Sequence, residues 1–462
     1  MIGRRDRHGT PNRCKSVGKT SACHLIRCDS ITCGDKICKY SVGTATRTIA
    51  RVKTQASFCG MKTHSAGACA KPDGRIRVMD VIARMNIGGP ATQLTGLCAQ
   101  LNHDKFDHRL YTGDVGGDEG DHFLLRNPAM PVHRVPGLGR SIKPADDVRA
   151  VMHLIKAIRA FRPHIVHTRT TKAGLLGRVA ARLSGINPAL AHVFHGHLLY
   201  GHFSPPKRFV YVRTERLLAS MSDRLVTVGA RVRDELLAAG IGRLEQYIVT
   251  PPGVGLGAIP SREDARLSLG LPLDAPVVAF VGRLTQVKRP DRFVAAATAV
   301  LRSVPGCRFV VCGDGELREE MEQAIAPMRD SFHLLGWRND VATVYSAADM
   351  VLLTSDNEGM PVALIEAGMA GRPSVSTRVG SVAEVIRHEH TGFVSSADVG
   401  ELVEHTVRLL RDPELRHQMG AAARHWTTSS FGVERLVADT EAMYRSLYEE
   451  RRANRASAGS VR

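Results

Sequence analysis

Short apolar runs alternate with stretches of helical periodicity along most of the chain. Each apolar run, typical of a buried strand, is followed by a segment whose apolar residues recur at the spacing of one helix face. This order of strand then helix predicts a doubly wound parallel sheet. In the first half the predicted strands are residues 76–82, 109–113, 164–167, 191–194 and 224–228, and the predicted helices include 91–101, 146–160 and 173–183.

A segment rich in glycine and proline, residues 250–257, interrupts this pattern and indicates a linker. A second series of strands and helices follows it, so we expect an α/β protein with two Rossmann-like sheets that face a cleft. The second predicted strands are 277–281, 308–312, 333–335, 349–354, 374–377 and 392–395, and the closing helices are 399–410, 413–426 and 433–451.

The predicted domains are therefore 76–252 and 253–430. Residues 431–462 are expected to form a helix that packs back on the N-terminal domain, followed by a basic tail.

The stretch SDNEGMPVALIEAGMAGRPS, residues 355–374, places two carboxylates eight residues apart. Pro361 suits the first position of a helix, and Gly371 suits its C-terminal cap. Glu358 would then lie in a loop at the carboxyl end of a strand, where open α/β sheets bind ligands. Glu366 would lie one to two turns into the helix, among apolar neighbours. A buried carboxylate needs partners, so both residues are candidates for a binding site.

Charge and cysteine are concentrated at the start of the chain. The 462 residues carry a net charge of +18, and residues 1–75 hold 15 Lys or Arg against 4 Asp or Glu and seven of the ten cysteines. A zinc or disulfide module is one interpretation. Because no C-x-x-C pair occurs there, we favour a basic, cysteine-rich leader that is disordered. Cys98, Cys307 and Cys312 are expected to be ordinary buried thiols.

No apolar run approaches the ~20 residues that a membrane-spanning helix needs. Residues 1–30 also lack the apolar core of a secretory signal. We therefore expect a cytoplasmic protein, which could also reside peripherally at the inner face of the cell membrane.

Several motifs, taken in order, resemble those of retaining GT-B enzymes of glycosyltransferase family 4. Residues 282–288 are similar to the G-R-L-x-x-x-K motif, residues 313–315 to the G-x-G turn, and Glu358 with Glu366 to the E-x7-E motif. Residues 86–90 resemble the glycine loop of the N-terminal half, and residues 195–197 its H-G loop. Residues 167–177 are similar to a bacterial subgroup that builds polysaccharide repeat units on lipid carriers. The resemblance extends over about residues 76–450.

Three positions depart from the usual family pattern. Val254-Gly255 follows the linker glycine where Val-Asp is frequent, Met360-Pro361 replaces Phe-Gly after Gly359, and Ser381 replaces a glycine. These departures concern the identity of the donor sugar more than the fold or the class of reaction.

The resemblance implies a retaining, hexosyltransferase-type enzyme. It would move a sugar from a UDP- or GDP-sugar to a glycan or a polyprenyl-diphosphate-linked acceptor, in polysaccharide biosynthesis. Neither a cofactor nor a metal ion is implied, and no D-x-D donor motif is found in the expected place. The implied catalytic residues are Arg283, Lys288, Glu358 and His195, and the implied donor-binding residues are Gly88, Gly89, Gly282, Gly313, Gly359, Met360, Pro361 and Glu366.

The chemistry of these side chains fits such a reaction. Arg283 and Lys288 follow a strand and precede a helix, so both can reach a diphosphate, Arg through two donors and Lys as a point charge. As implied by the resemblance, Glu366 holds the ribose hydroxyls and Glu358 orients the sugar. Gly88 and Gly89 would allow a close backbone approach, and His195 would hydrogen-bond the donor sugar or the reacting region.

A segment of mixed aromatic and basic residues, 202–213, lies in the half that generally takes the acceptor. It could rest on anionic headgroups, or it could be an ordinary amphipathic helix start. The alternative functions are a UDP-sugar 2-epimerase of the same fold, a catalytically silent homologue, and a nucleic-acid-binding protein. Residues 76–462 carry only +7 and contain no recognised nucleic-acid module, so no nucleic-acid partner is expected.

Overall fold

The computed structural model describes residues 74–116, 120–123, 131–196 and 205–460. The cysteine-rich segment 1–75 falls almost entirely outside these residues, as do His197 and residues 202–204 of the aromatic and basic segment.

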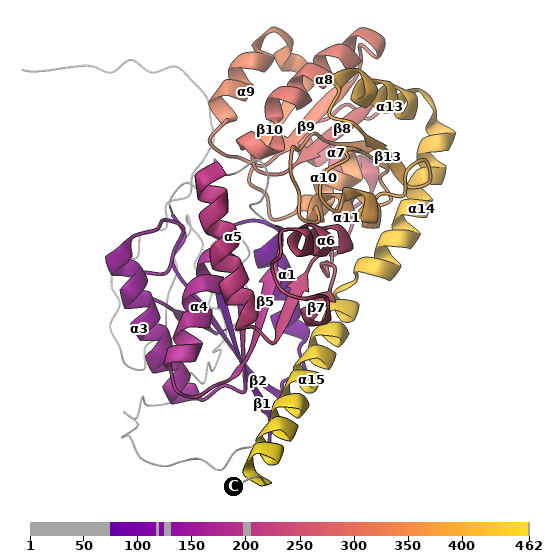
Figure 1. The fold of residues 1–462 in the computed structure, drawn as a ribbon. Helices are drawn as coiled ribbons and strands as arrows, with labels where there is room; N and C mark the ends of the chain where they lie inside the picture. The colour runs from indigo at the N-terminus through magenta and orange to yellow at the C-terminus, as the bar shows by residue number, and fades with distance from the viewer. Residues whose placement is uncertain (1–73, 117–119, 124–130, 197–204, 461–462) are drawn as a thin grey trace, which may run out of the picture. The chain divides into compact units, whose positions relative to one another are not determined.

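The N-terminal half contains a parallel sheet of seven strands (Figure 1). Its strand order is β3-β2-β1-β4-β5-β6-β7, so the order reverses between β1 and β4. Ligands of open α/β sheets bind at such a reversal, beyond the carboxyl ends of the strands. The strands are β1 (Ile76–Ile82), β2 (Phe106–Thr112), β3 (Val132–Arg134), β4 (Ile165–Arg169), β5 (Ala189–Phe194), β6 (Arg224–Thr227) and β7 (Tyr247–Val249).

The C-terminal half contains a parallel sheet of six strands in the order β10-β9-β8-β11-β12-β13, which reverses between β8 and β11. The loops that follow β8 and β11 therefore diverge at one point of the sheet edge. The strands are β8 (Val277–Val281), β9 (Arg308–Cys312), β10 (Phe332–Gly336), β11 (Met350–Leu353), β12 (Ser374–Thr377) and β13 (Gly392–Ser395).

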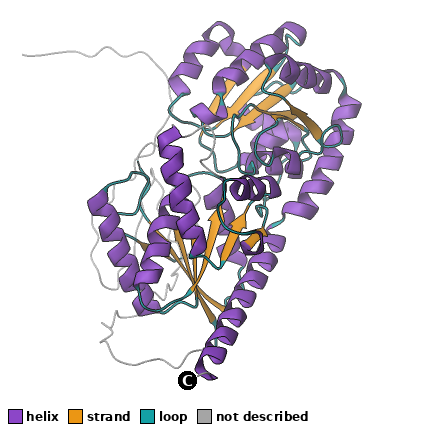
Figure 2. Cartoon of the chain, viewed as in Figure 1, coloured by secondary structure: helices purple, strands orange, loops and turns teal. Residues whose placement is uncertain are grey.

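Helices cover both faces of each sheet (Figure 2). On the first sheet, α3 and α4 pack on one face, while α1 and the last helix, α15, pack on the other. The helices are α1 (Gly89–Gln100), α3 (Pro144–Phe161), α4 (Thr171–Leu183), α5 (Pro205–Ser220), α6 (Ala230–Ala238), α7 (Arg262–Leu269), α8 (Pro290–Ser303), α9 (Arg318–Ile325), α10 (Val341–Ala347), α11 (Val362–Met369), α12 (Val382–Val385), α13 (Val399–Arg411), α14 (Pro413–Phe431) and α15 (Val433–Ser460).

The predicted fold class, two doubly wound parallel sheets, is confirmed. Two short strands, β3 and β7, were not predicted. Each has only three residues and lies at an edge of the first sheet, so each is shorter than the apolar runs of about 4–8 residues that indicate a buried strand. Pro361 was predicted to be the first helical residue, but it is the N-cap of α11 and keeps an extended ψ of 107°.

Helix α15 returns from the second half to the first sheet. Val433, Leu436, Tyr444 and Leu447 are buried against apolar side chains of the first half. Burial of several large apolar side chains contributes roughly 1.5–3 kcal/mol each. The last helix is therefore part of the N-terminal core, although it follows the whole C-terminal sheet in the sequence.

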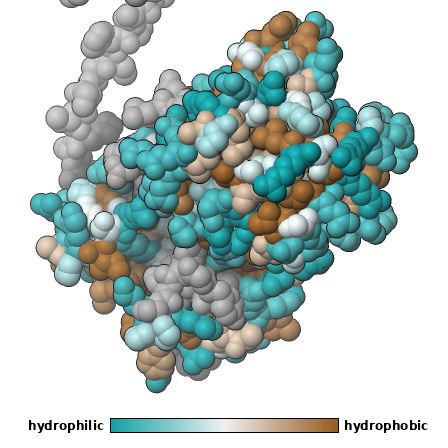
Figure 3. Space-filling model, turned by 90° about the horizontal axis from the view of Figure 1, so that it is seen from above, coloured by the Kyte–Doolittle hydropathy of each residue, from teal (hydrophilic) through white to brown (hydrophobic). Residues whose placement is uncertain are grey.

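The three predicted buried thiols, Cys98, Cys307 and Cys312, are buried and form no disulfide within the described part of the chain. Within the part of the chain that the structure describes, no helix combines the length and the apolar character needed to cross a bilayer. Polar and apolar side chains are interspersed over the face shown in Figure 3.

Candidate active site at the carboxyl ends of the two sheets

A cavity of about 480 Å³ lies where loops from the carboxyl ends of both sheets meet. Its walls come mainly from the loops that follow β1, β5, β8, β9, β10 and β11 and from the first turns of α1 and α11. All residues proposed from the sequence line this cavity, namely Gly88, Gly89, His195, Gly282, Arg283, Lys288, Gly313, Glu358, Gly359, Met360, Pro361 and Glu366. We call this cavity the cleft.

Lys288 contributes a positive charge to the cleft. The ammonium Nζ donates to Glu358 Oε1 at 2.5 Å, and the Ser355 hydroxyl donates to the same oxygen at 2.6 Å. Lys288 is the only lysine after Lys207, whereas arginine is frequent in that part of the chain. The side chain of Lys288 therefore supplies a compact point charge that arginine would not reproduce.

Arg283 follows β8 directly and lines the same wall. Among the described residues no hydrogen bond or ion pair engages its guanidinium group. Asp291, the acidic neighbour that the sequence offers as a surface partner, pairs with Arg289 instead at 2.6 Å. The donors of Arg283 are therefore available to an anionic ligand, and a guanidinium can hold two oxygens of a phosphate at once.

Two glycines of the C-terminal wall are required by close packing of the backbone. A Cβ atom at Gly313 would lie 1.9 Å from the Gly282 carbonyl oxygen, and one at Gly359 would lie 1.9 Å from the His195 carbonyl oxygen. No side chain fits at such distances. These positions keep the loops after β8, β9, β5 and β11 close together around the cleft.

Glu366 lies in the second turn of α11 and is only 7% exposed. The Tyr345 hydroxyl donates to its Oε2 at 2.9 Å. This hydrogen bond fixes the carboxylate at the cleft wall and supplies one of the partners that a buried carboxylate needs. Tyr345 was not predicted, because it belongs to α10 and no local pattern links it to Glu366.

His195 is the first residue after β5, and its Nε2 is buried with no hydrogen-bond partner among the described residues. Burial and then the nearby Arg169 and His167 lower the pKa of His195 to about 3. The imidazole is therefore neutral at physiological pH. A neutral imidazole can donate one hydrogen bond and accept one, but it cannot serve as a cationic acid.

A buried network of polar side chains lies beneath the N-terminal wall. Arg169 donates to both oxygens of Asp80, at 2.8 and 3.1 Å, and both side chains are almost inaccessible to solvent. Although burial raises the pKa of the Asp80 carboxyl, Arg169 and His167 hold it below the ordinary value. Tyr444 of α15 shares a 2.8 Å hydrogen bond with His167 Nδ1. The last helix is thus connected to the base of the cleft.

Sequence reasoning missed Arg84, which follows β1, and Trp337, which follows β10. Asn86 and Thr170 also line the cleft; they belong to the motifs 86–90 and 167–177 but were not named as site residues. Each stands just after a strand of a parallel sheet. The general rule that ligands bind at carboxyl ends of strands could have identified them.

The C-terminal half contacts the N-terminal half close to the cleft through Glu384. Its carboxylate accepts hydrogen bonds from the backbone N–H groups of Ala230 and Arg231, at 2.9 and 3.0 Å. These N–H groups lie in the first turn of α6, where no carbonyl of the helix itself can accept from them, so Glu384 caps the helix. His197, a weaker candidate from the sequence, lies outside the described residues.

Among the described residues, no group of three or more His, Cys, Asp or Glu side chains is arranged to hold a metal ion.

Comparison with known proteins assigns a family to this arrangement. Residues 88–253 match the family model of the glycosyl transferase 4-like domain, and residues 261–426 match that of the group 1 glycosyl transferases. Together these matches cover more than two thirds of the chain. The chain belongs to the group 1 glycosyltransferases. The resemblance of its motifs to glycosyltransferase family 4 is thereby confirmed.

Curated relatives of this glycosyltransferase act on different acceptors. An Escherichia coli protein named UDP-Gal:alpha-D-GlcNAc-diphosphoundecaprenol alpha-1,3-galactosyltransferase is 29% identical over 320 residues, which is 67% of this chain and 82% of the relative. The D-inositol 3-phosphate glycosyltransferase of Mycobacterium tuberculosis is 32% identical over 311 residues, 64% of this chain and 59% of that protein. The match thus spans less than two thirds of the mycobacterial relative.

Solved structures support the fold. Anabaena HepE, in complex with UDP and glucose, superposes with a TM-score of 0.70 at 19% identity, over 80% of this chain and all of that chain. Sucrose-phosphate synthase from Thermosynechococcus elongatus superposes with a TM-score of 0.69 at 20% identity, over 81% of this glycosyltransferase and all of that chain. At these identities the similarity shows the two-sheet fold.

Proposed function

We propose that this glycosyltransferase moves a sugar from a UDP-sugar, with retention of anomeric configuration, to a lipid-diphosphate-linked glycan during polysaccharide biosynthesis. The observation that carries the proposal is the convergence of Arg283, Lys288, Glu358 and Glu366 on one cavity of about 480 Å³. The name of the Escherichia coli relative, which transfers from UDP-Gal to a diphosphoundecaprenol-linked sugar, supports the choice of donor and acceptor class.

In this proposal the C-terminal wall holds the charged end of the donor. Breaking the bond between the anomeric carbon and the phosphate oxygen develops negative charge on the diphosphate, and stabilising that charge lowers the barrier. Arg283 and Lys288 provide the opposing positive charge. Glu366, held by Tyr345, accepts hydrogen bonds from the ribose hydroxyls, and Glu358 orients the sugar while it keeps Lys288 in place.

Retention follows in this proposal when the acceptor approaches from the face that the diphosphate leaves. The acceptor oxygen forms the new bond to the anomeric carbon, and its proton passes to the departing phosphate oxygen. No side chain of the cleft is required as the base. His195, neutral at physiological pH, contributes a hydrogen bond at the N-terminal wall and carries no charge.

The exposed face of α5 is a candidate contact with the membrane that carries such an acceptor. Phe209 and Leu217 are 62% and 64% exposed, and Arg213 lies between them in the sequence at helical spacing. The Arg213 guanidinium lies 5.1 Å from the Phe209 ring centre. Aromatic and basic side chains on one helix face suit the interface of an anionic bilayer. In this proposal α5 rests on that surface near the lipid-linked acceptor.

The donor is tested by incubating the protein with a panel of UDP- and GDP-sugars and measuring the shift of the melting temperature, followed by transfer to a lipid-diphosphate-linked sugar. A bound donor raises the melting temperature by mass action. We expect the largest shift with a UDP-sugar and a product with the anomeric configuration of the donor by NMR. A product with inverted anomeric configuration, or epimerisation of the donor without an acceptor, would overturn the proposal. A melting-temperature shift with GDP-sugars alone would show that the donor carries guanine in place of uracil.

The membrane contact is tested by flotation with phosphatidylglycerol vesicles. Phe209→Ser with Leu217→Ser should reduce the floated fraction several-fold, whereas Leu244→Ser, an equally exposed leucine outside α5, should not. Equal flotation of all variants would rule out α5 as the contact.

A further inference from the structure

A second cavity, of about 990 Å³, lies at the other end of the C-terminal sheet. Asp349 and Pro373, which immediately precede β11 and β12, line it, so it opens at the amino ends of the strands, away from the cleft. We call it the basic groove. Its lining consists of Arg262, Asp349, Ala370, Gly371, Arg372, Pro373, Pro413, Arg416, His417, Ala421, Arg424, His425, Thr428 and Ser429.

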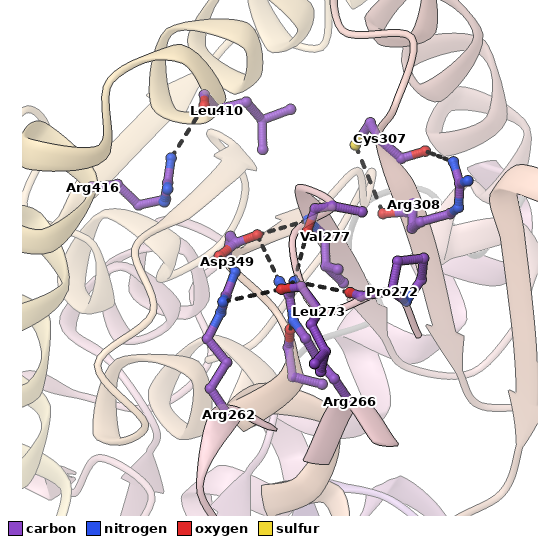
Figure 4. A network of polar contacts seen from close by, with 12 residues as sticks. Arg262, Arg266, Pro272, Leu273, Val277, Cys307, Arg308, Asp349, Leu410 and Arg416 are labelled. Carbon is purple, nitrogen blue, oxygen red and sulfur yellow. Dashed lines mark hydrogen bonds and ion pairs between the residues drawn. The ribbon is translucent and has the colours of Figure 1, made fainter. Parts of the chain in front are cut away.

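The charges of the basic groove are not balanced. Four arginines and two histidines face a single carboxylate, that of Asp349. This carboxylate is already engaged, because Oδ1 accepts from Arg262 at 3.1 Å and Oδ2 accepts from the buried Arg266 at 3.0 Å (Figure 4). The backbone N–H of Val277 donates to Oδ2 as well, at 2.8 Å. Asp349 thus compensates two arginines and has little capacity for the others.

Neutral carbonyl groups position the remaining arginines. Arg416 donates to the Leu410 carbonyl at 3.2 Å and to that of Leu409 at 2.7 Å, as Figure 4 shows for Leu410. Arg424 donates to the Met369 carbonyl at 3.2 Å. Carbonyls hold a guanidinium in place but do not neutralise its charge, so these side chains keep free donors on the groove.

The guanidinium group of Arg372 lies in an unfavourable electrostatic environment. Its terminal nitrogen donates to the Ser346 carbonyl at 3.2 Å, but its Nε is buried and has no partner among the described residues. Burial, followed by repulsion from Arg262, Arg424 and Arg266 against the attraction of Asp349, lowers the pKa of Arg372. An unpaired buried donor is destabilising. An anion bound in the groove would offset the repulsion among these arginines.

We propose that the basic groove is a binding site for a phosphate-bearing anion, separate from the cleft. Guanidinium groups that converge with free donors recognise phosphate oxygens through paired charge-assisted hydrogen bonds. The groove, with a volume of about 990 Å³, accommodates a ligand larger than a single phosphate ion. The site is independent of the function proposed above, since it shares no lining residue with the cleft.

The groove also adjoins the helix that carries Glu366. The first residues of α11 line the cleft, and the residues just after its last turn, Ala370 to Arg372, line the groove. A ligand in the basic groove would therefore contact the end of α11, the same short helix whose first residues line the cleft.

Calorimetric titration of the full chain with inorganic pyrophosphate tests the proposal. Because the cleft can also take a diphosphate, the titration is run on the wild type, on Lys288→Ala, and on the double variant Lys288→Ala with Arg424→Glu. Arg424 is exposed, so its substitution is compatible with folding. We expect Lys288→Ala to retain pyrophosphate binding and Arg424→Glu, combined with Lys288→Ala, to weaken it at least tenfold.

Arg411→Glu is the matched control, because Arg411 is also exposed, on α13, but lies outside the groove and bonds the Ser303 carbonyl. Unchanged affinity in Arg424→Glu with Lys288→Ala, or loss of all binding in Lys288→Ala alone, would overturn the proposal. This test does not depend on the function proposed for the cleft. It measures pyrophosphate binding in Lys288→Ala, a variant whose cleft is already altered, so it stays valid even if no nucleotide sugar binds the cleft.

A second arm identifies the source of the phosphate. Flotation with phosphatidylglycerol vesicles is compared with flotation with phosphatidylcholine vesicles, for the wild type and Arg424→Glu. Flotation that depends on Arg424 and is suppressed by pyrophosphate identifies a lipid headgroup. Pyrophosphate binding without any such flotation identifies a free phosphorylated compound. Absence of both would contradict the site.

Discussion

The two walls of the cleft differ in the kind of chemistry they present. The C-terminal wall exposes charged side chains, with Lys288 paired to Glu358 and Arg283 without a partner among the residues that the structure describes. The N-terminal wall presents glycine backbone, the neutral imidazole of His195 and a single arginine, Arg84, and its charged pair, Asp80 with Arg169, is buried beneath the surface. Most of the charged side chains that line the cleft therefore belong to the C-terminal half.

This difference has a physical basis in where each charge is solvated. Lys288 and Glu358 lie on loops at the sheet edge, where partial exposure and mutual pairing reduce the cost of keeping them charged. Asp80 and Arg169 sit in adjacent strands of the sheet, β1 and β4, and are stable only because each satisfies the other. A donor with a charged diphosphate would therefore be recognised by the C-terminal half, with the N-terminal half closing the space around the sugar.

The largest effect is expected on the charged wall. Lys288→Ala should lower kcat/KM by about 10- to 150-fold, because a hydrogen bond to a charged group contributes about 1.5–3 kcal/mol. Lys288→Arg should retain more activity than Lys288→Ala but less than the wild type, since the planar guanidinium group of arginine does not reproduce the compact ammonium charge of lysine. Steady-state transfer kinetics measure both. Lys105→Ala, at an exposed lysine of the N-terminal half, serves as the control, and a Lys288→Ala enzyme as active as that control would refute the assignment.

The next effect concerns the carboxylate in α11. Glu366→Gln should raise the KM for the nucleotide sugar about tenfold with little change in kcat, as expected for a group that binds the ribose in both ground and transition states. Tyr345→Phe should raise it less, because it removes only one hydrogen bond to the carboxylate, worth about 1 kcal/mol. A larger effect in Tyr345→Phe than in Glu366→Gln would contradict this order.

A smaller effect is expected in stability as the pH falls. Burial, and then Arg169, lower the pKa of His167 to about 3, against about 6.5 in the unfolded chain. Between these values the unfolded state binds a proton that the folded state does not, so stability that is full above about pH 6.5 is lost as the pH falls. From pH 7 to pH 5 the loss is at most about 2 kcal/mol for this group.

Urea unfolding at pH 7 and pH 5 measures this loss. His167→Gln should show a smaller decrease than the wild type, while His153→Gln, on the partly exposed side of α3, should decrease as the wild type does. An equal decrease in all three proteins would show that His167 titrates normally.

The smallest effect is expected at the neutral wall. Because the pKa of His195 is lowered to about 3, its ionisation should leave kcat/KM unaffected between pH 5.5 and 8. His195→Gln should lower kcat several-fold through the lost hydrogen bond and leave the shape of the pH profile unchanged. An acidic limb near pH 6.5 in the wild type that disappears in His195→Gln would show that the imidazole acts in its protonated form.

Much of the C-terminal wall could be predicted from the sequence because its groups are local. Strands β8, β9, β12 and β13 were predicted with the bounds that the structure has. β8 and most of β9 are short apolar runs, whereas β12, with the sequence SVST, was located by its place after the helix and Pro373. The residues that follow those strands must then gather at one edge of a parallel sheet. The positions of Arg283 and Glu358 follow from that rule, although their roles stay proposals.

The partners of those residues could not be predicted, because they are set by packing between distant segments. Tyr345 reaches Glu366 from another helix, and Tyr444 reaches His167 across 277 residues of sequence. The basic groove is a further case. Its arginines come from α7, the end of α11 and α14, and nothing in their local spacing indicates that they share one cavity.

The sequence by itself determined the two parallel sheets, the family and those residues of the cleft that belong to its loop motifs, since periodicity and loop motifs are properties of neighbouring residues. Only the tertiary structure decided which charges are compensated. The energy of a charge depends on the groups around it in space, so Asp349 compensates arginines from α7, whereas Arg372, despite equal charge, keeps a buried donor that no described residue accepts from.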